Sequence, residues 1–240
     1  MTHELILEVC AFNIQSCLIA QKAGAARIEL CDNPGDGGTT PSYGAIVAAR
    51  ERVSISLYPI IRPRGGHYLY DDDDLDVMLK DIKICRETGC NGISVGIQKH
   101  SGEIDAERLK RIVEFAQPLG VTCNRAFDVT PDPFKALEDI IACGCERVLT
   151  SGQAGGATEG IPVLAKLVRQ AGQRIVVMPG AGVRSTNIAE LIRETHATEY
   201  HTSARVAVPN NLPHQNPRIL DLGSVCVASE EELRRILSIG

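Results

Sequence analysis

Short apolar runs alternate with longer amphipathic stretches along almost the whole chain. Most of the runs are rich in Val, Ile and Leu, which is typical of strands that are buried on both faces of a parallel sheet. We predict a strand in each of them. They lie at residues 5–10, 26–31, 55–62, 92–96, 121–127, 146–151, 174–179 and 198–203.

The stretches between the runs have the spacing of amphipathic helices. Asp105, Ser185 and Ser229 precede three of them as candidate N-caps, and glycines such as Gly24 and Gly172 follow helix ends. We therefore predict a helix in each stretch. These helices lie at residues 13–24, 41–51, 73–89, 105–118, 132–143, 159–172, 185–195 and 229–238.

Eight strand-then-helix units in 240 residues imply a parallel sheet. This number of units favours a closed (β/α)8 TIM barrel that forms one domain over residues 1–240. A doubly wound open sheet is the alternative, but no GxGxxG motif follows the first strand. Residues 205–228 contain three prolines and do not fit the repeat, so we expect an irregular segment there, either a functional flap or a contact surface.

Charge and hydropathy exclude several classes of protein. A net charge of -5 argues against a nucleic-acid partner, which requires a concentrated basic face. The apolar runs are shorter than the ~20 residues of a membrane helix, and the amino end lacks the order of a signal peptide. We therefore expect a cytoplasmic protein whose nine cysteines are reduced thiols and mostly small apolar core residues.

The segments LEVC and IELC repeat one pattern at the first two predicted strands. Alternate residues of a strand share a face, so Glu8 and Cys10 point one way, and Glu29 and Cys31 do likewise. In barrels of this class the working residues cluster at the carboxyl ends of the strands. The other candidates at these ends are Arg62, Arg64, Asn124, Arg125, Asp128, Thr150, Ser151, Gly180, Gly182, Arg184, His201 and Ser203.

Two of these groups each allow two interpretations. Arg62 and Arg64 beside the glutamates form either an internal ion-pair network or a clamp for an anionic ligand. The PGAGVR segment, with Gly180 and Gly182, provides either a phosphate site at a helix start or a tight turn without a ligand. His201 is the one histidine at a strand end and hence the candidate acid or base.

Together, these residues resemble the CutC family, known as copper homeostasis proteins. The resemblance covers residues from about 5 to 205 and rests on motifs in the same order. They are ELC with GGTTPS (29–42), IIRPRGG (60–66), NRAFD (124–128), RVLTSG (147–152), VMPGAGV (177–183) and ATEYHTSAR (197–205).

The resemblance implies a (β/α)8 barrel, a cytoplasmic location and a homo-oligomer, commonly a dimer. It also implies a link to copper tolerance, with monovalent copper bound by cysteine, and the family's cysteine candidates fall on Cys10 and Cys31. The family's usual His-Arg-Ala-Phe-Asp begins with Asn124 here. An asparagine forms hydrogen bonds but does not exchange a proton near pH 7.

Two functions therefore stand side by side. The first is a copper-handling protein that binds Cu(I), a soft ion that favours thiolates, through Cys10 and Cys31. The second is a lyase or isomerase that acts on a small phosphorylated or carboxylated substrate at the barrel mouth. Its candidate acid–base residues are Glu8, Glu29, Asp128 and His201, and its candidate ligand-binding residues are Arg62, Arg64, Asn124, Arg125, Ser151, Gly180 and Gly182. No organic cofactor is implied.

Overall fold

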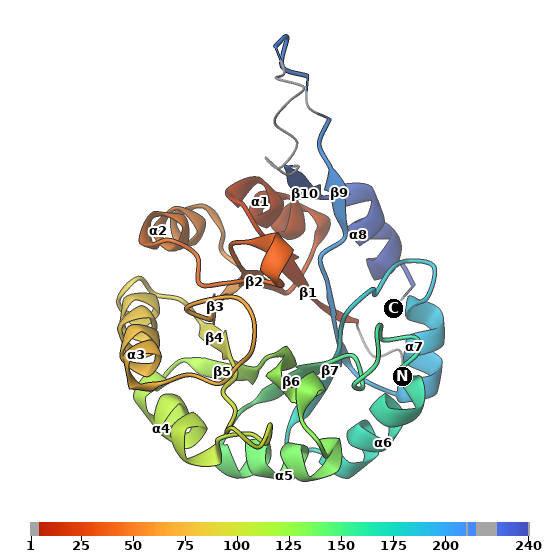
Figure 1. Cartoon of the computed structure of the whole chain (residues 1–240). Coiled ribbons are helices and arrows are strands. Elements are labelled where there is room, and N and C mark those ends of the chain that lie inside the picture. Colours follow the sequence, from red (N-terminus) through yellow and green to blue (C-terminus); the bar gives the residue numbers. More distant parts are fainter. Residues whose placement is uncertain (1–4, 210, 215–224, 240) are drawn as a thin grey trace.

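A computed structural model of the chain describes residues 5–209, 211–214 and 225–239. Eight parallel strands lie inside a ring of eight helices in these residues, as the view along the barrel axis shows (Figure 1). The predicted (β/α)8 TIM barrel is therefore confirmed. The strands are β1 (Ile6–Ala11), β2 (Arg27–Leu30), β3 (Ser56–Ile61), β4 (Gly92–Val95), β5 (Gly120–Cys123), β6 (Arg147–Thr150), β7 (Val176–Pro179) and β8 (Glu199–Thr202).

A helix follows each of the eight barrel strands. Asp105 and Ser229 cap α4 and α8 as predicted, because their side chains accept from the backbone N–H groups of Arg108 and Glu232. Ser185 is not an N-cap, because α7 begins three residues later than predicted, after Asn187. The helices are α1 (Ile14–Ala23), α2 (Tyr43–Arg52), α3 (Asp72–Glu87), α4 (Ala106–Ala116), α5 (Pro133–Cys143), α6 (Ile161–Ala171), α7 (Ile188–Thr195) and α8 (Glu230–Leu237).

Seven parallel ladders join the strands in the order β7-β6-β5-β4-β3-β2-β1-β8. Strands β7 and β8 lie next to each other where the barrel closes, although the described residues include no ladder between them. Outward-facing side chains such as Leu7, Val9 and Ile28 join the hydrophobic core between strands and helices. Since side chains alternate along a strand, Glu8, Cys10 and the residues in phase with them point into the barrel.

Part of the segment predicted to be irregular forms a two-stranded antiparallel ribbon. Strand β9 (Arg205–Ala207) pairs with β10 (Cys226–Ala228), and the ribbon projects away from the barrel beside α1 and α8 (Figure 1). Two hydrogen bonds attach it to α1, from Asn13 to the Cys226 carbonyl and from the Ala228 amide to Ser16. Residues 215–224 of the predicted segment lie outside the described residues.

The barrel has a cavity near each end. A cavity of about 440 Å³ lies at the amino ends of β6, β7 and β8, where backbone turns and residues such as Val177 and Ala197 line it. A smaller cavity of about 280 Å³ lies at the carboxyl ends of the strands. Chemistry in this class of barrel takes place at the carboxyl ends, and the smaller cavity contains the larger set of reactive side chains. Among the described helices, none combines the length and apolar character needed to cross a bilayer.

Candidate functional site

The cavity at the carboxyl ends, hereafter the mouth cavity, brings together six of the residues predicted from sequence. They come from β1, β2, β8 and the chain after β5. The remaining lining is mainly apolar or aromatic and includes Ile60, Tyr68 and Leu149. The six residues are Cys10, Glu29, Asn124, Arg125, Asp128 and His201.

The register between β1 and β2 places two thiols and a carboxylate together. Cys10 lies opposite Glu29 across the ladder, and Cys31 follows two residues later on the same face of the chain. The sulfur atoms of Cys10 and Cys31 are 3.6 Å apart, and the Cys31 sulfur is 3.6 Å from a Glu29 oxygen. One ligand atom from each of the three residues lies within 4.8 Å of the others, which is close enough for a single metal ion.

The two thiols have different acidities. The hydrogen bond with Cys31 lowers the pKa of Cys10, against the opposing effect of burial, and His201 lowers it further. Burial raises the pKa of Cys31 well above its usual value, and the hydrogen bond with Cys10 acts in the same direction. Cys10 is therefore the thiol that ionises first.

His201 is held by a buried carboxylate below it. Strands β1 and β8 pair Glu8 with His201, and the His201 Nδ1 atom is 2.7 Å from a Glu8 oxygen. Its Nε2 atom lies 3.7 Å from Glu29. Burial alone would lower the pKa of His201, but hydrogen bonds with Cys10 and Glu8 and the charge of Glu29 raise it well above its usual value.

Glu8 itself lies one layer below the mouth cavity and does not line it. Burial would raise the pKa of Glu8, but the hydrogen bond with His201 and the charge of Arg27 lower it to about 2. Glu8 is therefore an anion that orients His201 rather than a group that exchanges protons with a ligand in the cavity.

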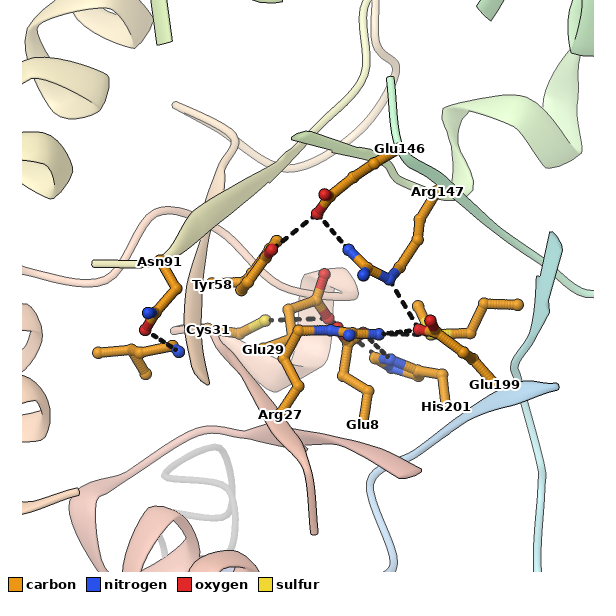
Figure 2. A network of polar contacts seen from close by, with 12 residues as sticks. Glu8, Arg27, Glu29, Cys31, Tyr58, Asn91, Glu146, Arg147, Glu199 and His201 are labelled. Atoms are coloured by element: carbon orange, nitrogen blue, oxygen red, sulfur yellow. Dashed lines mark hydrogen bonds and ion pairs between the residues drawn. The ribbon is translucent and has the colours of Figure 1, made fainter. Parts of the chain in front are cut away.

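Sequence reasoning missed a buried ion-pair network beneath the mouth, which we call the floor network (Figure 2). Arg27 bonds Glu8 and, at 2.5 Å, Glu199, and Arg147 bonds Glu199 at 2.7 Å. Arg147 also pairs with Glu146, which accepts a hydrogen bond from the Tyr58 hydroxyl. Strand parity could have revealed it, because Arg27 and Glu199 precede Glu29 and His201 by two residues.

Arg62 and Arg64 do not form the predicted clamp or pair with Glu8 and Glu29. The Arg62 guanidinium donates to the backbone carbonyls of Asp36, Gly38 and Gly66, so it fixes two loops. Arg64 bonds Asp74 and the Leu69 carbonyl, outside the mouth cavity. A long arginine side chain can reach partners on several sides. In this structure the N–H groups of Arg62 and Arg64 donate to backbone carbonyls of the loops.

The predicted anion site at the PGAGVR segment stays a prediction, and its glycines lie outside the mouth cavity. The Gly180 amide donates to the Thr150 carbonyl, and neither Gly180 nor Gly182 lines the mouth cavity. The Ser185 amide and hydroxyl already bond the carboxylate of Glu232 from α8. An internal carboxylate thus binds the residue that follows the segment.

Asp128 is a buried hydrogen-bond acceptor that positions Arg125. Its carboxylate accepts from the Thr150 hydroxyl at 2.5 Å, from the Ser151 amide and hydroxyl, and from Arg125 Nε at 2.7 Å. Ser151 is fully buried and supports Asp128 without lining the cavity. These hydrogen bonds fix the Asp128 carboxylate, which in turn orients Arg125.

A parallel barrel with thiols, a histidine and carboxylates at its carboxyl mouth defines a TIM-barrel protein with a polar site at the strand ends. The same fold occurs in the aldolase QR15, at 15% identity and a TM-score of 0.62 over 85% of this chain and 92% of that one. The model of the CutC family matches residues 5–206, and the chain belongs to this family.

Relatives in this family are similar over nearly their whole length. The CutC family protein of Parabacteroides distasonis is 48% identical over 95% of this chain and 93% of its own. That of Chromobacterium violaceum is 49% identical over 88% and 85%. The solved structure of the CutC protein of Streptococcus agalactiae, described as a candidate copper homeostasis protein, has a TM-score of 0.78 and 35% identity, over 83% of this chain and 98% of that one.

Proposed function

We propose that this protein acts in copper homeostasis and binds monovalent copper through Cys10 and Cys31. The observation that carries the proposal is the 3.6 Å separation of the two sulfur atoms at the barrel mouth. Cu(I) is a soft ion, and thiolates are the ligands that it favours. Copper homeostasis is the role ascribed to the related protein of Streptococcus agalactiae, which gives independent support.

The geometry favours a bent or three-coordinate site over a linear one. With metal–sulfur bonds of about 2.3 Å, as in zinc thiolates, two sulfurs around one ion are about 4.6 Å apart if linear and about 4.0 Å apart if trigonal. The observed separation is closer to the second value. The third residue whose ligand atom lies within 4.8 Å of both sulfurs is Glu29, although a carboxylate is a hard donor, and the His201 Nε2 atom lies 3.7 Å from Glu29.

We further propose that the protein works in the cytoplasm, where glutathione and thioredoxin keep thiols reduced. The nine cysteines are free, and those at the mouth have to stay reduced to hold Cu(I). A homodimer is implied by the family resemblance and stays a prediction. Sedimentation of the purified protein would test it.

The copper site predicts that Cys10→Ser and Cys31→Ser each remove most Cu(I) binding, because a single thiolate remains. Competition with a chromophoric Cu(I) chelator under anaerobic, reducing conditions measures the affinity. Tight binding of about one equivalent by the wild type, and a loss of at least about 100-fold in each variant, is the expected result.

A second buried thiol pair provides the matched control for this experiment. Cys85 near the end of α3 and Cys90 just before β4 are both buried and lie toward the amino ends of the strands, away from the mouth. Replacing both with serine should leave the tight equivalent in place. Unchanged Cu(I) affinity in a Cys10→Ser, Cys31→Ser double variant that melts like the wild type would refute the assignment.

The second candidate function, a lyase or isomerase, is supported by the pair of His201 and Glu8. A carboxylate on one ring nitrogen of a histidine fixes its orientation and tautomer, which is the arrangement that acid–base catalysis uses. Such an enzyme needs a small-molecule ligand in the mouth cavity, and the opposite wall of the barrel carries evidence for one.

A further inference from the structure

One wall of the barrel interior, formed by β4, β5 and the residues after them, consists of glycines and small polar side chains. Ile93 and Val95 of β4 point outward into the hydrophobic core, so the residues in phase with them point inward. The same holds for β5, where Val121 and Cys123 are in the core. The inward set consists of Gly92, Ser94, Gly96, Gly120, Thr122 and Asn124.

Three side chains of this wall have buried polar atoms without a hydrogen-bond partner in the described part of the chain. They are Ser94 Oγ, Thr122 Oγ1 and Asn124 Nδ2, and their residues are 1%, 1% and 3% exposed. An unsatisfied buried donor or acceptor destabilises the folded protein. Of the three, Asn124 is the one that lines the mouth cavity, so its donor is the one that a ligand there can pair.

The orientation of the Asn124 amide is set by the backbone. Its Oδ1 atom accepts from the Ala126 amide at 3.0 Å, which leaves the Nδ2 donor free. Gly96 makes room for this arrangement, since a Cβ there would lie 2.3 Å from Asn124 Oδ1. Asn124 lines the mouth cavity, so its free donor is available to a ligand there.

The next residue, Arg125, adds a positive charge to the same cavity. Its Nε atom donates to Asp128 and its Nη2 atom to Ser151, at 2.7 and 3.2 Å. Among the described residues Nη1 has no partner, and the side chain is 44% exposed. Arg125 is therefore fixed in place with a remaining donor, the state in which an arginine binds an incoming anion.

Size and charge restrict the ligand. The cavity of about 280 Å³ lies at or below the lower end of the about 300–1,000 Å³ of drug-sized sites, so the ligand is small. Glu29 and Asp128 also line it and oppose a doubly charged phosphate, whereas a carboxylate brings one charge. A planar carboxylate also suits the planar guanidinium.

We propose that the mouth cavity binds a small 2-oxo or 2-hydroxy carboxylic acid. The carboxylate lies on Arg125 Nη1, and the oxygen on the neighbouring carbon accepts from Asn124 Nδ2. This site is built from side chains that the copper proposal does not use, so either assignment can fail while the other stands.

Paired ligands test the site without relying on any one variant. Pyruvate and propionate have nearly the same size and charge, but only pyruvate has the 2-oxygen. Calorimetry on metal-free wild-type protein should show pyruvate binding at least about tenfold more tightly than propionate, since pairing a buried donor is worth about 1–3 kcal/mol. Asn124→Ala should abolish this preference, and Arg125→Ala should weaken both ligands.

A matched control separates this site from general charge. Arg169→Ala removes an exposed arginine on α6 and should leave both affinities unchanged. Equal affinity of the wild type for pyruvate and propionate, no binding at millimolar concentration, or phosphate binding as tight as pyruvate would each overturn the proposal. Water would then be the partner of Asn124 Nδ2.

Discussion

An Arg27→Met variant should lose about 3–5 kcal/mol of unfolding free energy, the usual effect of removing one partner of a buried ion pair. Arg27 is 5% exposed and bonds both Glu8 and Glu199, which are 2% and 6% exposed. Methionine preserves much of the apolar stem but leaves Glu8 without its only arginine partner in the described structure. Urea denaturation followed by circular dichroism measures the change.

The exposed pair of Arg174 and Glu138 provides the control for Arg27. The two side chains are 48% and 46% exposed, and exposed ion pairs contribute about 0–1 kcal/mol. Arg174→Met should therefore stay within about 1 kcal/mol of the wild type. An Arg27→Met protein as stable as this control would mean that the floor network contributes little to folding.

Acid should remove the contribution of Glu8 between pH 4.5 and 2. Its pKa is lowered from 4.5 to about 2 in the folded protein, so folding favours the ionised form. The resulting stabilisation is present above pH 4.5 and is lost as the pH falls through the folded pKa. A shift of this size corresponds to about 3 kcal/mol.

A Glu8→Gln variant isolates this contribution from the other carboxylates. The metal-free variant should be less stable than the wild type at pH 6, and the difference should shrink as the pH approaches 2. Thermal melts of both proteins across this range measure the difference. If the stability difference between the two proteins stays constant with pH, the pKa of Glu8 is not lowered in the folded protein.

The alternation of apolar and amphipathic stretches was sufficient to predict the barrel. Each apolar run predicts its strand, and each amphipathic stretch predicts its helix, from neighbouring residues alone. No contact between distant residues has to be known. The start of α7 was misplaced because Ser185, which resembles an N-cap in sequence, bonds Glu232, which lies 47 residues further on. That partner becomes visible only once α8 is placed beside α7.

The candidate site was predicted in part. Strand parity grouped Glu8 with Cys10 and Glu29 with Cys31. The structure places Cys10, Glu29 and His201 at one mouth cavity, whereas Glu8 lies one layer below it. The same rule applied one layer deeper would have found Arg27 and Glu199. Arg62 was misassigned because the length of an arginine side chain allows partners in several loops, and sequence does not order those loops.

In the described residues no ladder of backbone hydrogen bonds joins β7 and β8, so these two strands are the edges of the barrel sheet. His201 is on one edge strand, whereas Cys10 is on β1, and Cys31 and Asn124 directly follow β2 and β5, and each of these three strands has a neighbour on both sides. Local opening requires the least free energy where the fewest backbone hydrogen bonds break. Among the barrel strands, amide deuterium exchange should therefore be fastest along β8 and β7. The side of the mouth that carries His201 can then open locally while the two thiols keep their spacing.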